Sequence, residues 1–203
     1  MDVSTVSASG KIESTPVHFF GHKDHGALAS FTRLVTHSGH SLSLTSDHLL
    51  PVAPAPGTPW ANRIFKRSSS VKEGDYVWVN HEGSLELSEI TGISSYTSRG
   101  LFNPYSKNGA TLVNDVVASD HSAWILDPFI SDINAQYAPA IYAPLLQTTL
   151  AYLYATAPTF VEAISECFYI SEAAGTAWED FVCAVSTTGS ALKSGIASIF
   201  VSV

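Results

Sequence analysis

The sequence has little cysteine and little charge. Only Cys167 and Cys183 are present among 203 residues, too few for a multi-disulfide scaffold or a four-thiolate zinc site. Ten Lys and Arg residues against 18 Asp and Glu give a net charge of −8, which argues against a nucleic-acid partner. Charged residues make up 14% of the chain and apolar residues 45%. This composition excludes a chain that is disordered throughout.

The N-terminus also lacks the features of a secretory signal, because residues 1–5 carry neither a basic segment nor an apolar run. Composition divides the chain in two. Residues 1–131 hold nine of the ten basic residues and all eight histidines, whereas 132–203 hold one basic residue, Lys193, and long apolar runs. We therefore expect a domain over 1–131 and a separate C-terminal extension over 132–203.

Short β-strands are predicted across the first part. Alternating or β-branched residues favour strands at 30–36, 41–45 and 76–80, with a turn at 37–40 between the first two. Prolines predict a loop over 51–59, and Ser98-Arg99-Gly100 predicts a further turn. No helical pattern of ten residues appears before residue 130, so the domain is predicted to be mainly β.

The first part contains an internal repeat. Residues 2–13 align with 75–86, with Asp, Val, Gly and Glu in register at a spacing of 73. Each copy runs from a strand through a turn into another strand. This pattern predicts a duplicated β unit and a pseudo-two-fold fold.

The C-terminal extension begins with 29 residues, 133–161, that carry no charge. That length would span a bilayer, but Pro139, Pro144 and Pro158 interrupt it. Three short amphipathic helices are therefore expected. Such an apolar extension packs on the β domain, on a protein partner or on lipid. A non-catalytic interaction module that binds a partner or membrane through this extension is one functional hypothesis.

Chemistry is concentrated in Thr45-Ser46-Asp47-His48, where a hydroxyl and an imidazole follow a strand. Thr hydroxyls orient water or donate hydrogen bonds, and His protonates a departing amide nitrogen. The Ser119-Asp120-His121 segment repeats the Ser-Asp-His order of residues 46–48. It is either a by-product of duplication or a second set of residues in the same cleft.

Six of the eight histidines lie between residues 18 and 48. His22, Asp24 and His25, joined by His37 or His48, would supply imidazole and carboxylate ligands for zinc. A metal-dependent hydrolase is therefore an alternative, although histidines in exposed β turns are commonly surface residues. Our main expectation is that the protein has no cofactor.

Three stretches, taken together and in order, resemble the Hint domain of hedgehog-type autoprocessing proteins. Residues 31–52 match an apolar strand, a turn and a strand that leads into Thr-x-x-His-Leu. Residues 71–79 are similar to a Gly-Asp-x-Val strand, and 100–119 resemble the family's last repeat, which ends in Ala-Ser. The resemblance covers about residues 2–125 and implies a pseudo-two-fold β fold, which also accounts for the internal repeat.

The resemblance implies that the protein cleaves itself. In the family, a Cys attacks the preceding carbonyl in an N-to-S acyl shift, and a nucleophile, which is cholesterol in animal hedgehogs, then releases the thioester. Thr45 and His48 match the residues that assist the shift. His22 falls where the family has the Asp that activates the sterol, and Asp120 falls where animal hedgehogs have a Cys. These four residues are the candidate catalytic residues.

Further expectations follow from the same resemblance. The substrate is the protein's own upstream polypeptide, the acceptor is water or a sterol-like nucleophile, and the compartment is the secretory route. We expect the nucleophilic Cys to lie upstream of Asp2. The chain is therefore expected to be N-terminally truncated and inactive as written, because neither Cys167 nor Cys183 is placed to substitute.

Overall fold

A computed structural model describes residues 1–121 of the protein, together with Tyr152 and Thr156. The described residues form nine strands and two single-turn 3₁₀ helices. In chain order these are β1 (Asp2–Val6), β2 (Ile12–Thr36), β3 (Ser41–Thr45), β4 (Leu49–Ala53), η1 (Trp60–Asn62), β5 (Ile64–Arg67), η2 (Ser68–Ser70), β6 (Tyr76–His81), β7 (Ser84–Ser106), β8 (Ala110–Val113) and β9 (Val116–Ser119). The prediction of a mainly β domain is confirmed.

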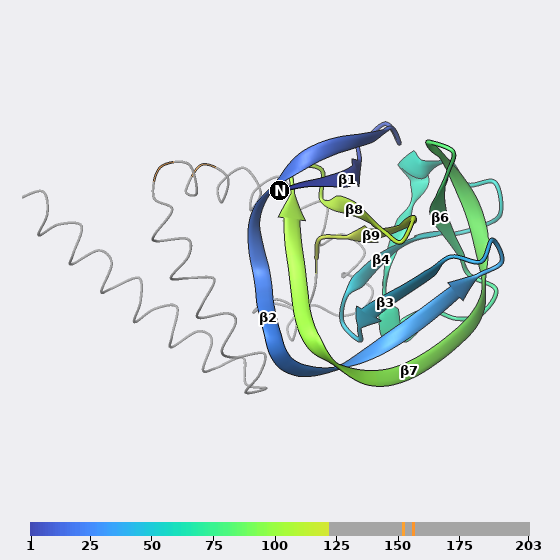
Figure 1. Cartoon of the computed structure of the whole chain (residues 1–203). Helices are drawn as coiled ribbons and strands as arrows, with labels where there is room; N and C mark the ends of the chain where they lie inside the picture. The colour runs from blue at the N-terminus through green and yellow to red at the C-terminus, as the bar shows by residue number, and fades with distance from the viewer. Residues whose placement is uncertain (122–151, 153–155, 157–203) are drawn as a thin grey trace, which may run out of the picture.

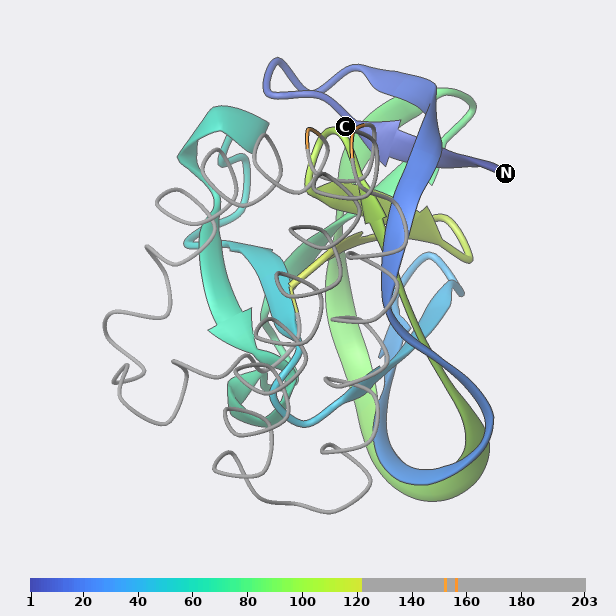
Figure 2. The same cartoon turned by 90° about the vertical axis from the view of Figure 1, so that its left-hand side faces the viewer.

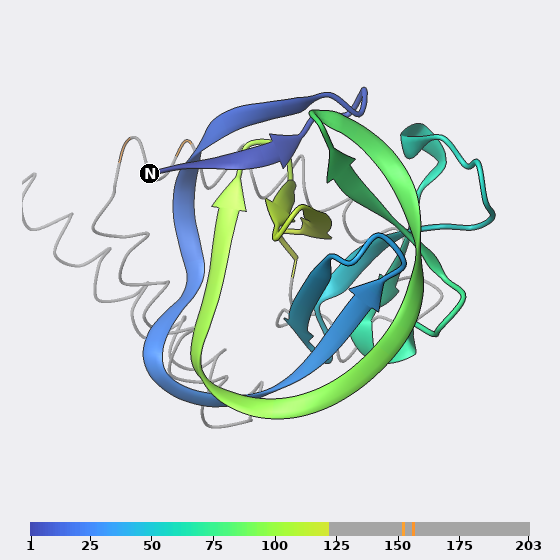
Figure 3. The ribbon, with the colours of Figure 1, turned by 45° about the vertical axis from the view of Figure 1, so that its right-hand side comes forward.

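Two long strands frame the domain. β2 and β7 pair antiparallel from Val17–Ser106 to Thr36–Ile90, and they curve together around the short strands β3, β4, β8 and β9 (Figures 1 and 3). The strands are joined in the order β3-β2-β1-β8-β9-β6-β4-β5, with β7 pairing to β2 and β6. Every pair is antiparallel.

Apolar side chains from the short strands fill the centre. One cluster of buried residues joins β2, β3, β4, β6, β7 and β9 and includes Leu34, Leu50, Val77 and Ile90. A second cluster lies around Trp60 and Trp78, whose rings meet edge to face at 5.2 Å. Because β4 and β9 are buried along their whole length, the residues at their ends lie deep in the domain.

The predicted duplication is visible in the order of the elements. A short strand, a long strand and two short strands (β1 to β4) are followed, after β5 and the 3₁₀ turns, by the same sequence in β6 to β9. The strands β1 and β6 and the turns after them fall on the two copies of the internal repeat. The pseudo-two-fold arrangement expected from the sequence is thereby confirmed.

The turn predicted at Ser98-Arg99-Gly100 is wrong. These residues lie inside β7, which runs unbroken from Ser84 to Ser106. Gly100 has a φ of +101°, and the register between β2 and β7 shifts between the Asp24–Leu101 and Leu28–Arg99 pairs. Glycine permits this backbone conformation at little cost, so a bulge bends the two strands together there (Figure 2).

The loop predicted to begin at Pro51 starts later. Pro51 lies within β4 and pairs with Phe65 of β5, while β6 pairs only with Val52 and Ala53. Proline has no amide hydrogen and cannot donate to a neighbouring strand. It is therefore tolerated where a strand is paired on one side only.

The predicted helical extension over 132–203 lies outside the described residues, apart from Tyr152 and Thr156. In the part of the chain that is described, no helix is long and apolar enough to cross a bilayer.

Candidate active site

The turn between β3 and β4 carries Thr45 and His48. The His48 backbone amide donates to the Thr45 carbonyl at 3.1 Å and closes the turn. Ser68, at the start of η2, anchors this turn through two hydrogen bonds. Its hydroxyl donates to the Thr45 carbonyl at 2.6 Å, and its backbone amide donates to the His48 carbonyl at 2.9 Å. The two candidate side chains are thus presented by a fixed backbone.

The His48 ring is buried and oriented by a backbone carbonyl. Its Nε2 lies 2.7 Å from the Ser119 carbonyl oxygen at the end of β9. A carbonyl only accepts, so Nε2 must carry a hydrogen in both the neutral and the charged ring. The proton that His48 gains and loses is therefore the one on Nδ1.

Asp120 follows β9 and is almost completely buried, with 1% of its surface exposed. One carboxylate oxygen accepts from the backbone amide and the hydroxyl of Ser106, each at 2.6 Å, and the other accepts from the Thr111 hydroxyl at 2.6 Å. Burial raises the pKa of Asp120 to about 6, against the lowering effect of these hydrogen bonds.

His121 lies beside His48 and is buried without a hydrogen bond to either ring nitrogen. Its backbone is well anchored, because its carbonyl accepts from the Leu49 amide at 2.9 Å and its amide donates to the Ser119 hydroxyl at 3.1 Å. Burial, reinforced by charge repulsion from His48, lowers the pKa of His121 to about 4. The ring is therefore neutral near pH 7.

A cavity of about 130 Å³ brings three of the four candidate residues together. Thr45, His48 and Asp120 line it, with Asn103 and Thr111 beside them. The fourth candidate, His22, pairs through its backbone with Asn103 across β2 and β7, but its side chain is outside what the structure describes. Its role stays a prediction.

Comparison with family models decides what kind of domain this is. The family described as the Hint module matches residues 2–128, which is more than half of the chain. The chain belongs to the Hint family. It is therefore a member of an autoprocessing family.

Curated relatives of this Hint domain include hedgehog-type proteins. It is 34% identical over 102 residues to Indian hedgehog protein of Gallus gallus, covering 49% of this chain and 25% of the relative. It is 29% identical over 130 residues to Protein qua-1 of Caenorhabditis elegans, covering 58% and 11%, and 29% identical over 109 residues to Warthog protein 6 of the same organism, covering 53% and 18%. The chain thus matches a quarter or less of the length of these relatives.

Among solved structures, inteins are similar to this Hint domain at lower identity. The crystal structure of an intein from a hyperthermophile has 17% identity and a TM-score of 0.47, covering 58% of this chain and 70% of the intein. The crystal structure of the PabCDC21-1 intein has 14% identity and a TM-score of 0.48, covering 60% and 70%.

The two Ser-Asp-His segments of the Hint domain have diverged. Asp47 is exposed and faces Arg67 at 3.5 Å, whereas Asp120 is buried against two hydroxyl groups. Ser119, Ser106 and Thr111 hold the site together but were not among the candidates, because isolated hydroxyl residues in strands carry no distinctive pattern. The repeated Ser-Asp-His order was the one signal that pointed to Ser119.

The residues of the alternative zinc site have other contacts in the Hint domain. One Asp24 carboxylate oxygen accepts from the backbone amides of Gly26 and Ala27 at 2.6 and 3.0 Å, and the His25 ring meets the ring of Phe102 at 4.8 Å. Within the described residues no three His, Cys, Asp or Glu side chains gather as metal ligands. The zinc alternative stays an untested prediction.

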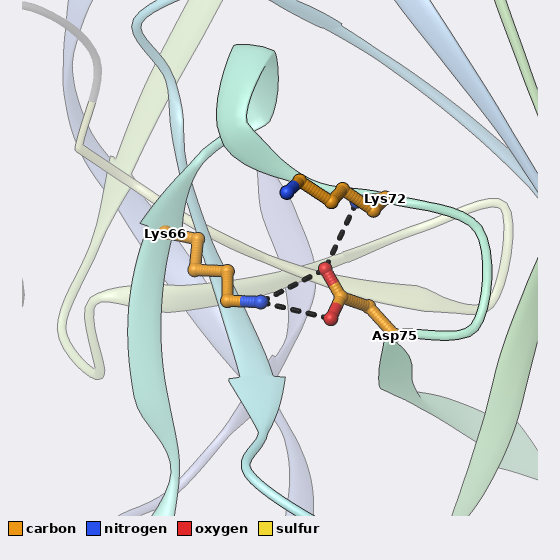
Figure 4. Close-up of polar contacts among 3 residues, drawn as sticks. All are labelled: Lys66, Lys72 and Asp75. Atoms are coloured by element: carbon orange, nitrogen blue, oxygen red, sulfur yellow. Dashed lines mark hydrogen bonds and ion pairs between the residues drawn. The ribbon is translucent and has the colours of Figure 1, made fainter.

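The Gly74-Asp75 turn before β6 has a structural role. Both Asp75 carboxylate oxygens accept from Lys66 Nζ, at 2.8 and 2.9 Å, and one of them also accepts from the Lys72 backbone amide at 2.9 Å (Figure 4). The carboxylate therefore ties β5 to the entry of β6 and forms an ion pair with Lys66.

Proposed function

We propose that this chain is the Hint part of a protein that cuts itself by an N-to-S acyl shift, with His48 as the proton carrier. The observation that carries the proposal is the 2.7 Å contact of His48 Nε2 with the Ser119 carbonyl, at the wall of a cavity shared with Thr45. This contact orients the ring and commits Nε2 to the carbonyl as a donor.

The shift requires a cysteine thiol next to the cleaved bond, joined to the domain ahead of Asp2. Sulfur bonds to the preceding carbonyl carbon, the carbon–nitrogen bond breaks, and a thioester forms. In the net reaction, one proton moves from sulfur to the departing amide nitrogen. His48 delivers that proton through Nδ1, and such general acid catalysis contributes about 10²- to 10⁴-fold in rate.

Thr45 supports the same step. Its hydroxyl comes from the last residue of β3 and lines the cavity with His48, while its carbonyl is held by Ser68. We propose that the hydroxyl hydrogen-bonds the amide that is cleaved and keeps it in reach of His48. A secretory location is proposed on the resemblance to hedgehog-type proteins alone.

The test is thiol-dependent release of a reporter. The chain is expressed with the upstream residues encoded by its gene, behind a fluorescent protein, and dithiothreitol is added to intercept the thioester. We expect His48→Ala to slow release by about 100-fold or more and Thr45→Ala to slow it less. His81→Ala is the matched control, because His81 is exposed at the end of β6.

Three results would overturn the proposal. The upstream codons could carry no cysteine, release by thiol could be absent from the unaltered protein, or His48→Ala could cleave as fast as the control. A reporter joined directly to Met1 of the 203 residues provides a second comparison. No thiol is then adjacent to the junction, and we expect no cleavage.

A further inference from the structure

Among the residues that the structure describes, no cationic side chain contacts the buried carboxylate of Asp120. Its described partners are Ser106 and Thr111, which are neutral. Of the described titratable residues, His48 lines the same cavity and His121 is the next residue in the chain. Burying an ionised carboxylate without a cation lowers the stability of the fold. Packing alone therefore does not explain a carboxylate at this position.

One lone-pair site of the Asp120 carboxylate has no hydrogen-bond donor among the described residues. An ionised carboxylate has about four lone-pair sites, and the amide and two hydroxyl groups occupy three of them. The oxygen that accepts from Thr111 has the remaining site. Asp120 and Thr111 both line the cavity, together with His48 and Thr45.

The cavity is small. Its volume of about 130 Å³ is well below the roughly 300–1,000 Å³ of pockets that enclose drug-sized ligands. Each water takes about 30 Å³ in the liquid, so a cavity of this size holds a few waters.

We propose that Asp120 is the general base that activates water as the acceptor in the second step of self-processing. This inference rests on the proposed function, since the thioester is the substrate. Water oxygen bonds to the thioester carbonyl carbon, its proton passes to the Asp120 carboxylate, and the carbon–sulfur bond breaks. The products are a free carboxylic acid on the released segment and a cysteine thiolate, which is reprotonated from Asp120.

The position and chemistry of Asp120 support this role. His48, which carries protons in the first step, and Asp120 line the same cavity. The base must be ionised to act, and a pKa of about 6 leaves the carboxylate ionised at pH 7 yet more basic than an ordinary Asp.

The test compares release by water with release by dithiothreitol from the same reporter fusion. We expect Asp120→Asn to slow water release by about 100-fold or more, with thiol-driven release within threefold of the unaltered protein. Thr111→Val is the second variant. It removes a hydrogen bond that lowers the Asp120 pKa, so the midpoint of the pH–rate profile for water release should move upward.

The inference is overturned if Asp120→Asn hydrolyses normally, if it loses both forms of release while remaining folded by circular dichroism, or if the released segment carries a sterol. Should Asp120→Asn fail to fold, an unchanged midpoint in Thr111→Val overturns the inference and a raised one supports it. Absence of thiol-driven release from the unaltered protein would instead refute the proposed function.

Discussion

His121 and Asp120 should give the folded domain opposing responses to acid. The pKa of His121 is about 4, lowered from 6.5, so folding favours its neutral ring. That contribution is complete above pH 6.5 and is lost as the pH falls towards 4. The pKa of Asp120 is about 6, raised from 3.8, so folding favours its protonated form. That contribution is complete below pH 3.8 and is lost as the pH rises through 6.

The sizes follow from the pKa values at about 1.4 kcal/mol per unit. Between pH 7 and pH 5, protonation of His121 in the unfolded chain destabilises the fold by about 2 kcal/mol, and protonation of folded Asp120 restores about 1 kcal/mol. We therefore expect His121→Phe to remove the His121 contribution to the change in stability between pH 7 and pH 5. Its free energy of unfolding, relative to the unaltered chain, should be about 2 kcal/mol higher at pH 5 than at pH 7.

Urea unfolding of the 203-residue chain at the two pH values measures this difference. At pH 7 the variant should be at least as stable as the unaltered chain, because the substitution removes two buried ring nitrogens that have no hydrogen bond and keeps a ring near Tyr105. His81→Phe, at an exposed position, is the control. A stability difference for His121→Phe that does not change with pH would refute the reasoning.

Three further substitutions, one of them a control, test the packing of the site. Ser119→Ala removes the hydroxyl that donates to a β4 carbonyl at 2.6 Å, and we expect it to lower the free energy of unfolding by about 1–2 kcal/mol; no loss in urea unfolding would contradict that bond. Gly21→Ala places a Cβ 2.8 Å from the Tyr105 ring, and we expect it to lower the free energy of unfolding by about 1–3 kcal/mol. In the control Gly92→Ala the nearest atom is 3.8 Å away, so the loss of stability measured by thermal unfolding should be clearly smaller. Equal losses in the two variants would contradict the close approach at Gly21.

A short strand such as β3 could be predicted from the sequence because one of its faces is buried. Leu42 and Leu44 alternate with Ser41 and Ser43 in β3, and the structure buries both leucines. The middle of the long strands could not be predicted, since residues 23–30 and 91–102 contain no buried side chain. Backbone pairing between β2 and β7 holds that segment together. Such pairing requires no alternation of apolar and polar residues, so the sequence carries no hydrophobic periodicity there.

The candidate site was predictable in part. Thr45 and His48 stand out because a turn after an alternating strand sets them three residues apart. The resemblance to hedgehog-type proteins pointed to Asp120, but not to its surroundings. Thr111 and Ser106 reach it from β8 and β7 through tertiary structure alone, and the burial that raises its pKa has no signature in the local sequence.

The most direct test of the account is the mass of the N-terminal fragment released from the fusion that carries the natural upstream residues. With dithiothreitol present, self-processing through a thioester predicts a fragment that carries the thiol adduct, and loss of that fragment in His48→Ala. A protein that stays intact under these conditions, or the same fragment formed at the same rate without His48, would contradict the account.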